Sequence, residues 1–164
     1  MKRPAADISP LALRVATGLI FIPHGYAKVF GSGGVSAFAS DLPSYHIPSF
    51  LGYVAAYAEF FGAILLVAGL LTRLDAFLLA CTMAVAVFIV QLPDAINGAD
   101  AGTNMFFTAM KAVELPLALL AMSVAVLLLG PGRYSLDALL RIEERLLKNR
   151  TAAGTATAPR TSES

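Results

Sequence analysis

The sequence predicts an all-α protein, a four-helix transmembrane bundle whose two termini both lie on the cytoplasmic side (N-in, C-in). Of its 164 residues, 57% are hydrophobic and only 14% are charged, whereas a soluble domain carries about a quarter charged residues. The mean hydropathy of +0.72 is too high for a surface that faces water. Lipid as the solvent explains the missing polar surface, and the apolar residues gather in four stretches of the length that crosses a bilayer, about 20 residues.

The four predicted spans cover residues 11–30, 50–71, 74–92 and 109–129. The first span is interrupted by Arg14, His24 and Lys28. A secretory signal peptide would begin in a similar way, but its apolar core is short and its cleavage site follows closely. Here a polar segment and a glycine-rich stretch intervene, so this stretch is expected to remain as a membrane span.

Basic residues predict the orientation of the bundle. With four spans, the termini and the short turn at 72–75 share one side. That side holds ten of the twelve lysines and arginines, namely Lys2, Arg3, Arg14, Arg73, Arg133, Arg141, Arg145, Lys148, Arg150 and Arg160. Only Lys28 and Lys111 lie on the other side. Because lysine and arginine concentrate on the cytoplasmic side of a membrane, we predict cytoplasmic termini and an inner (plasma) membrane location.

The chain is predicted to have four parts. Residues 1–10 form a cytoplasmic N-terminus, and residues 11–132 form the membrane domain. In residues 133–148 leucines fall near one helical face with basic residues among them, which predicts a short cytoplasmic amphipathic helix that lies on the leaflet or binds a partner. Residues 149–164 are rich in Thr, Ala, Gly, Pro and Ser and are predicted to be disordered. The outside loop at 31–49 is expected to contain a short surface helix.

Glu59 is the clearest functional candidate within the spans. It lies about ten residues into the second span, about 13–15 Å from its outer end. A carboxylate at mid-helix costs about 2.5–3.5 kcal/mol, so such a residue is expected to have a partner and a role. Its neighbours three and four residues away are small: Ala55, Ala56, Gly62 and Ala63. Another helix can approach this face closely, and Glu59 is therefore expected to point into the bundle.

Five further polar residues map to the same outer half of the bilayer: His24, Lys28, Gln91, Lys111 and Glu114. His24 and Lys28 are four residues apart and share a helix face, and Pro23 is expected to bend the helix beside them. With Glu59 they predict an outer-leaflet polar pocket, because ionisable residues within spans often line pathways. The structural alternative is that Glu59 pairs with Lys28 or His24, and Glu114 with Lys111, to fix the helix register.

Several kinds of site are not expected. The net charge of +1 and the lack of a basic, aromatic-interleaved stretch argue against nucleic acid. Cys81 is the single cysteine, so the chain forms no internal disulfide or Cys-x-x-Cys pair. With only His24 and His46 as histidines, a metal site is not expected, and no haem, flavin or iron–sulfur motif is present. Electrons for redox chemistry must come from a partner, a bound cofactor or a substrate.

Several short motifs resemble the DoxX family. They are His24-Gly25-x-x-Lys28, Glu59-x-x-Gly62, Gly69-Leu-Leu-Thr-Arg73, the Lys111–Glu114 pair and Gly-Pro-Gly-Arg133-Tyr-Ser-Leu-Asp137. The last motif is the most specific, and the resemblance runs from about residue 11 to residue 141. It implies a four-helix bacterial inner-membrane protein linked to redox work. Some relatives are described as the quinone-reducing subunit of a thiosulfate:quinone oxidoreductase, and others belong to an oxidoreductase complex concerned with thiol and oxidative stress.

The resemblance favours a quinone-interacting subunit of a membrane oxidoreductase system. In this interpretation the candidate catalytic residues are Glu59, His24 and Lys28, and the candidate quinone-binding residues are Lys111, Glu114 and Gln91. The expected partners are the lipid bilayer and either a soluble redox enzyme or a second membrane subunit. Because four short helices bury little area, a homo-oligomer is also expected.

Two other functions stay open at this point. The chain could be a scaffold that anchors a soluble enzyme through residues 133–148. It could also be a carrier for a small solute or protons. Residues 61–71 and 117–129 are almost wholly apolar, which argues against a polar path across the bundle and disfavours the carrier.

Overall fold

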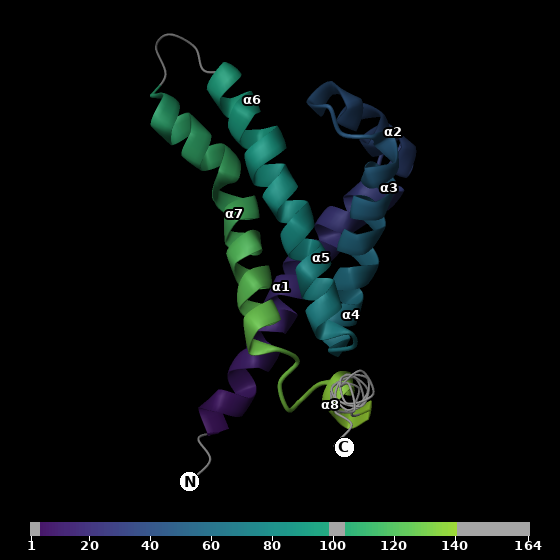
Figure 1. Ribbon diagram of the computed structural model, residues 1–164, viewed down its shortest axis with the longest axis vertical. Helices are drawn as coiled ribbons and strands as arrows, with labels where there is room; N and C mark the ends of the chain where they lie inside the picture. The colour runs from purple at the N-terminus through teal and green to yellow at the C-terminus, as the bar shows by residue number, and fades with distance from the viewer. Residues whose placement is uncertain (1–3, 99–103, 141–164) are drawn as a thin grey trace, which may run out of the picture.

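The computed structural model describes residues 4–98 and 104–140. Within these ranges helices are the only regular secondary structure, and short turns join them (Figure 1). Four helices are long and apolar enough to cross a membrane: Ile8–Phe30, Ser49–Ala68, Thr72–Asn97 and Met105–Leu129. The predicted all-α bundle with four spans is therefore confirmed. The side on which the termini lie stays a prediction. The predicted tail at 149–164 lies outside the described residues.

Each span is built from one helix or from several joined end to end. The first is α1 (Pro4–Phe30), and the fourth is α7 (Met105–Leu129). The second runs through α3 (Ser49–Tyr57), the π-helix η2 (Ala58–Gly62) and α4 (Ala63–Ala68). The third runs through α5 (Thr72–Val85), the π-helix η3 (Ala86–Gln91) and α6 (Leu92–Asn97). Outside the spans lie α2 (Gly34–Asp41), the 3₁₀-helix η1 (Leu42–Tyr45) and α8 (Leu136–Leu140).

The third span is longer than the sequence predicts. The predicted span ends at residue 92, directly before Pro93, yet the helix continues to Asn97. Proline removes one backbone donor and collides with the carbonyl four residues earlier. The π-turns of η3 open the hydrogen-bond ladder directly before Pro93, so the ring is accommodated at the start of α6. α1 likewise contains Pro10 and Pro23 without interruption.

The second span is shorter at its far end than predicted. It stops at Ala68 because Gly69 has a φ of +73°, which ends the helix in the left-handed conformation that glycine tolerates best. Leu71 also has a positive φ of 52°, and Thr72 starts the next span. The turn at 69–71 is therefore very tight. The fourth span begins earlier than predicted, at Met105, where the side chain of Asn104 accepts a hydrogen bond from the backbone N–H of Phe106 at 3.1 Å.

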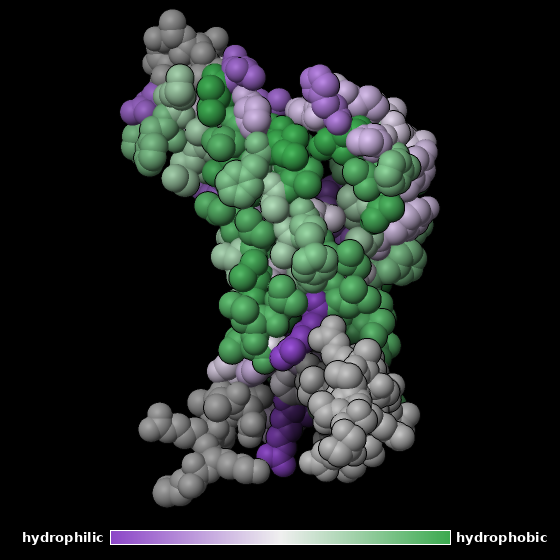
Figure 2. Space-filling view, in the orientation of Figure 1, coloured by the Kyte–Doolittle hydropathy of each residue, from purple (hydrophilic) through white to green (hydrophobic). Residues whose placement is uncertain are grey.

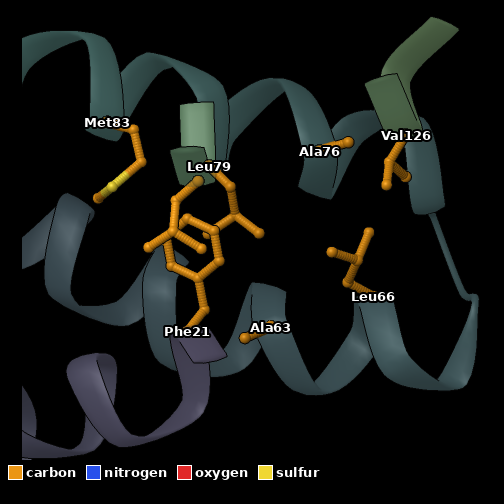
Figure 3. Packing of buried hydrophobic residues seen from close by; sticks show 8 residues of the cluster. Phe21, Ala63, Leu66, Ala76, Leu79, Met83 and Val126 are labelled. Atoms are coloured by element: carbon orange, nitrogen blue, oxygen red, sulfur yellow. The ribbon is translucent and has the colours of Figure 1, made fainter. Parts of the chain in front are cut away.

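The hydrophobic core lies where all four spans meet (Figure 3). Its buried members are Phe21 of α1, Ala63 and Leu66 of α4, Ala76, Leu79 and Met83 of α5, and Leu119 and Val126 of α7. Alanines at the crossings let the helices approach, and Phe21 fills the space between them. The rest of the apolar surface faces outward: Phe106 and Phe107 are each 65% exposed and Leu128 is 75% exposed. Figure 2 shows hydrophobic residues over the middle of the visible face and hydrophilic ones towards its two ends, as expected for a protein in lipid.

The two ends of the bundle differ. One end, which we call the turn end, holds the turn at 69–71 and helix α8. The other, the loop end, holds α2 and the start of α7 (Figure 1). By the positive-inside prediction, the turn end is the cytoplasmic one.

Residues 130–137, which we call the clasp, close the turn end. Asp137 accepts hydrogen bonds from the backbone N–H groups of Leu71 at 2.7 Å and of Thr72 at 2.8 Å, and so caps the first turn of α5. The backbone N–H of Asp137 donates to the carbonyl of Gly69 at 2.9 Å. The clasp thus ties the segment after the fourth span to the turn between the second and third.

Arg14 of α1 binds the clasp through its side chain. This side chain is buried, and its guanidinium donates to the carbonyl oxygens of Pro131 and Tyr134. A Cβ at Gly69 would lie 2.5 Å from Arg14 Nη1, so only glycine leaves room for the guanidinium. Three segments that are far apart in the sequence therefore meet here: α1, the turn at 69–72 and the clasp. The motif that most specifically resembles the DoxX family is a structural tie.

At the loop end, one hydrogen bond links η1 with α6. The hydroxyl of Tyr45 donates to Asp94 Oδ2 at 2.6 Å. This bond raises the pKa of Tyr45 above its ordinary value, because the neutral phenol is the form that donates. The hydrogen bond therefore stabilises the folded state fully at pH values below the ordinary tyrosine pKa of about 10. This stabilisation is lost as the pH rises through the higher pKa of Tyr45 in the folded protein.

We therefore expect Tyr45 to ionise at a higher pH than an ordinary tyrosine. Ultraviolet absorbance of tyrosinate, followed during an alkaline titration, measures this as a late component. Replacing Tyr45 with Phe should remove the late component, and Asp94→Asn should move it towards the ordinary tyrosine value. A late component that persists in Tyr45→Phe would show that the link at the loop end does not form.

Candidate functional site

A buried ion pair joins the first and second spans. Lys28 Nζ lies 2.6 Å from both Oε1 and Oε2 of Glu59, and donates to each oxygen. The Glu59 side chain is only 2% exposed, whereas that of Lys28 is 26% exposed. The expectation that Glu59 points into the bundle is confirmed. Burial makes this pair strongly coupled, because a carboxylate withdrawn from water depends on its partner for compensation.

Glycines on α1 bring the two spans close enough for the pair to form. A Cβ at Gly25 would lie 2.5 Å from the backbone nitrogen of Phe60, and one at Gly18 would lie 2.8 Å from the carbonyl oxygen of Ala63. Gly18, Gly25 and Lys28 are seven and three residues apart, so they share one face of α1. The backbones therefore touch at Gly25, one turn before Lys28.

Glu59 lies in the π-helix η2, which spans Ala58–Gly62. A π-turn inserts one extra residue into the helical ladder, and such turns often occur at functional sites. The extra residue rotates the side chains of α4, which follows η2, about the helix axis relative to those of α3, which precedes it. Glu59 and Gly62 are both buried by it against the neighbouring helices.

Replacing Gly25 with alanine should separate the ion pair. The methyl group cannot fit against the backbone of Phe60, so α1 must move away from η2. Overpacking of this kind costs about 1–3 kcal/mol. We expect a lower Tm in detergent or nanodiscs, measured by circular dichroism. Gly34→Ala is the matched control for the added methyl, since the nearest atom to a Cβ there is 3.6 Å away, although its positive φ of 62° adds a backbone cost. A loss at Gly25 no greater than that at Gly34 would contradict the close contact.

Aromatic side chains cluster on the same two spans as the ion pair. Tyr26, Phe30 and Phe60 pack with ring centroids 5.1–6.2 Å apart, and Phe61 and Tyr57 extend the group along the second span. We call these five residues the aromatic cluster. Tyr26, Phe30, Tyr57 and Phe61 are each more than 40% exposed, so they face lipid. From the loop end, the ring of Phe38 in α2 lies 4.8 Å from Lys28 Nζ, within the range of a cation–π contact.

The structure brings together only two of the six candidate residues. His24 is exposed, and its Nδ1 lies 2.9 Å from the carbonyl oxygen of Ile20 in its own helix. Gln91 is half-buried at the end of η3. Lys111 and Glu114 are exposed on α7. The Lys28–Glu59 ion pair is one of the ties that the structural alternative predicts. Its other tie, between Lys111 and Glu114, is not formed by these two described residues.

The comparisons with known proteins agree with this architecture. The family model for DoxX matches residues 9–92, just over half of the chain. The chain belongs to the DoxX family. This matched region covers nearly all of the first span, the whole second span, the third span as far as residue 92, and both members of the buried ion pair. No solved structure matches this DoxX-family chain.

Three relatives of this DoxX-family protein carry informative names. A Bacillus subtilis protein named "Putative oxidoreductase CatD" is 41% identical over 86 residues, 52% of this chain and 62% of that protein. The Escherichia coli "Inner membrane protein YqjF" is 26% identical over 82% of this chain and 93% of its own length. An uncharacterized membrane protein of Mycobacterium tuberculosis is 27% identical over 89% of this chain and 86% of its own length. The match thus spans less than two thirds of CatD but most of the other two.

Sequence reasoning missed three buried charged residues in this DoxX-family bundle: Arg14, Asp75 and Asp137. Arg14 counted only as one of the basic residues that predict orientation, and Asp75 was assigned to a turn. Within the described ranges, no three His, Cys, Asp or Glu side chains gather as a metal site would require. The one signal that would have found Asp75 is its position within the predicted third span, one residue after its start, where a carboxylate is costly.

Proposed function

We propose that this DoxX-family membrane protein is a quinone-interacting subunit of a membrane oxidoreductase system, and that the Lys28–Glu59 pair is the centre of its quinone site. The observation that carries the proposal is the buried ion pair in a π-helix at membrane depth. Ionisable groups within spans are costly and usually functional. The name of the Bacillus relative as an oxidoreductase points in the same direction.

The residues around the pair suit a planar, apolar ligand with polar oxygens. The aromatic cluster offers exposed rings next to Glu59 on the lipid-facing side, where a lipid-soluble molecule arrives. Offset stacking and edge contacts of aromatic rings favour such a ligand. Lys28 is partly exposed and can donate to an oxygen of the ligand while it keeps contact with Glu59.

The chemistry of the pair matches the demand of quinone reduction. A quinone takes up two electrons and two protons to become a quinol. The ammonium group of Lys28 favours negative charge that develops on an oxygen nearby, and Glu59 is placed to give or accept a proton. The electrons are supplied by a redox partner, either a soluble enzyme or a second membrane subunit.

Mass spectrometry of lipids that co-purify with the protein tests this function. We expect the wild type, purified gently from its native membranes, to retain a quinone that Glu59→Gln loses. Glu114→Gln is the matched comparison, because it also changes a carboxylate within a span, but an exposed one that makes no ion pair with Lys28. That variant should retain the quinone.

Other outcomes of the same experiment favour the alternatives. A soluble enzyme that is retained by both the wild type and Glu59→Gln, without any quinone, would support the scaffold. The ion pair would then be structural. Equal retention of quinone by wild type and Glu59→Gln would remove Glu59 from the site.

A further inference from the structure

A second buried carboxyl group lies nearer the turn end of the bundle than the Lys28–Glu59 pair. Asp75, in the first turn of α5, is 4% exposed. Its Oδ2 atom is buried and has no hydrogen-bond partner. An ionised carboxylate in such a place is costly, and a carboxyl group avoids this cost by holding a proton. The proposed quinone site makes no use of Asp75.

Among the residues that the structure describes, no cation makes a hydrogen bond with the buried Oδ2 of Asp75. α8 contributes Asp137, whose two oxygens are already bonded to backbone N–H groups. The guanidinium of Arg14 from α1 is bonded to the clasp, and that of Arg73 lies along Gly130. α4 and residues 115–129 of α7 contain no ionisable side chain.

An open position connects Asp75 with Glu59. A Cβ at Gly62 would have a single atom within 4 Å outside its own helical neighbourhood, Asp75 Oδ1, at an ordinary contact distance of 3.8 Å. Gly62 follows Glu59 by three residues in the same π-helix, η2. Asp75 therefore lies beside the π-helix that carries Glu59.

Two buried hydroxyl groups lie on the helices that enclose Asp75. Thr72, one turn before Asp75 on α5, and Ser123, on α7, are fully buried, and the hydroxyl oxygen of each has no partner. A hydroxyl both donates and accepts, so it can pass a proton along a chain of hydrogen bonds. At the turn end, the backbone N–H of Thr72 donates to Asp137 of the clasp.

We propose that Asp75 is a proton-carrying residue that takes up protons from the turn end and supplies them to Glu59. The proposal rests on the proposed quinone function, in which Glu59 passes a proton to the reduced ligand. In each cycle the O–H bond of Asp75 breaks as one forms on Glu59, and Asp75 regains a proton from water at the turn end. Electrons follow a separate route, from the redox partner.

Infrared spectroscopy of the protein in nanodiscs tests the first part. The carbonyl stretch of a protonated carboxyl group is distinct from that of a carboxylate. We expect a protonated band at neutral pH in the wild type that is lost in Asp75→Asn and unchanged in Asp41→Asn, a matched change of an exposed aspartate. A wild type without this band, or a band that Asp75→Asn leaves unchanged, would overturn the proposal.

Proton transfer from Asp75 to Glu59 is tested in a second variant, Lys28→Met. In Lys28→Met, Glu59 loses its cation and should gain a protonated band of its own, whose exchange in deuterated water can be timed. Adding Gly62→Ala fills the open position without a clash and removes no polar group. If Asp75 supplies Glu59, this exchange slows by roughly 10²-fold, the lower end of what a positioned acid or base contributes. An unchanged exchange rate would overturn the relay.

These results are independent of quinone. Failure of the infrared bands would remove the relay and leave the quinone site standing. Failure of the quinone to co-purify would remove the proposed function, while a protonated Asp75 would remain.

Discussion

Asp137→Ala is expected to destabilise the protein by about 2–5 kcal/mol, because it leaves two backbone N–H groups without acceptors. These are the N–H groups of Leu71 and Thr72, at 2.7 and 2.8 Å from the carboxylate in the wild type. The N–H of Thr72 is buried, so water cannot replace the lost acceptor. Loss of the cap frees the start of α5 and releases the clasp. Thermal unfolding in nanodiscs, followed by circular dichroism, measures the effect.

Two further variants make this result specific. Asp137→Asn keeps one acceptor oxygen, so its loss should lie between those of the wild type and Asp137→Ala. Asp41→Ala changes an exposed aspartate at the other end and should alter stability by no more than about 0.5 kcal/mol. If Asp137→Ala were as mild as Asp41→Ala, the clasp would not hold the turn end together.

Lys28→Met is expected to cost about 3–5 kcal/mol, because the buried carboxyl group of Glu59 loses the cation that compensates its charge. Glu59→Gln should cost only about 1 kcal/mol, the worth of an ordinary hydrogen bond. The asymmetry follows from burial: Glu59 is 2% exposed, whereas Lys28 is 26% exposed and can move its ammonium towards the membrane boundary. Unfolding of each variant in a mixed detergent titration gives both values.

The double variant separates a coupled pair from two independent residues. With Glu59→Gln already in place, Lys28→Met leaves no buried carboxyl group without its partner. The double variant should therefore be more stable than Lys28→Met alone. Losses that simply add would mean that the two side chains do not depend on each other. The geometry of two 2.6 Å contacts predicts strong coupling.

The fold was predictable because the bilayer imposes a simple rule on composition. A stretch of about 20 apolar residues without many charges has few alternatives to a spanning helix, and all four spans are present. Their ends were less predictable, since they depend on local backbone events. The π-helix η3 allows Pro93 within the third span, and Gly69 ends the second span three residues early.

The site was predictable only in part, because sequence gives depth along a helix but not the contacts between helices. Glu59 and Lys28 were expected at a similar depth, and they do pair. His24, at nearly the same depth, instead turns to its own backbone. The close approach of α1 and η2 depends on Gly18 and Gly25, and their seven-residue spacing on one face was the available signal.

The buried charged residues at the turn end could not be recognised from the sequence, because each seemed to have another role. Arg14 and Asp75 lie near the ends of spans, where charged residues are ordinary. Arg14 is buried where it donates to the clasp, and Asp75 is buried beside Gly62 of the second span. The clasp joins residues more than sixty positions apart, such as Asp137 and Thr72. Tertiary contacts of this separation leave no periodic pattern in the sequence.

Photoaffinity labelling with an azido-quinone tests the central claim most directly, since it locates the ligand without any knowledge of the electron donor. In nanodiscs, with unlabelled quinone as competitor, we expect competed labelling of the wild type in peptides that contain residues 24–30 and 57–62. Glu59→Gln should lose this labelling and Glu114→Gln should keep it. Competed labelling confined to α5–α7, or labelling at 24–30 and 57–62 that is unaffected by Glu59→Gln, would contradict a quinone site at the Lys28–Glu59 pair.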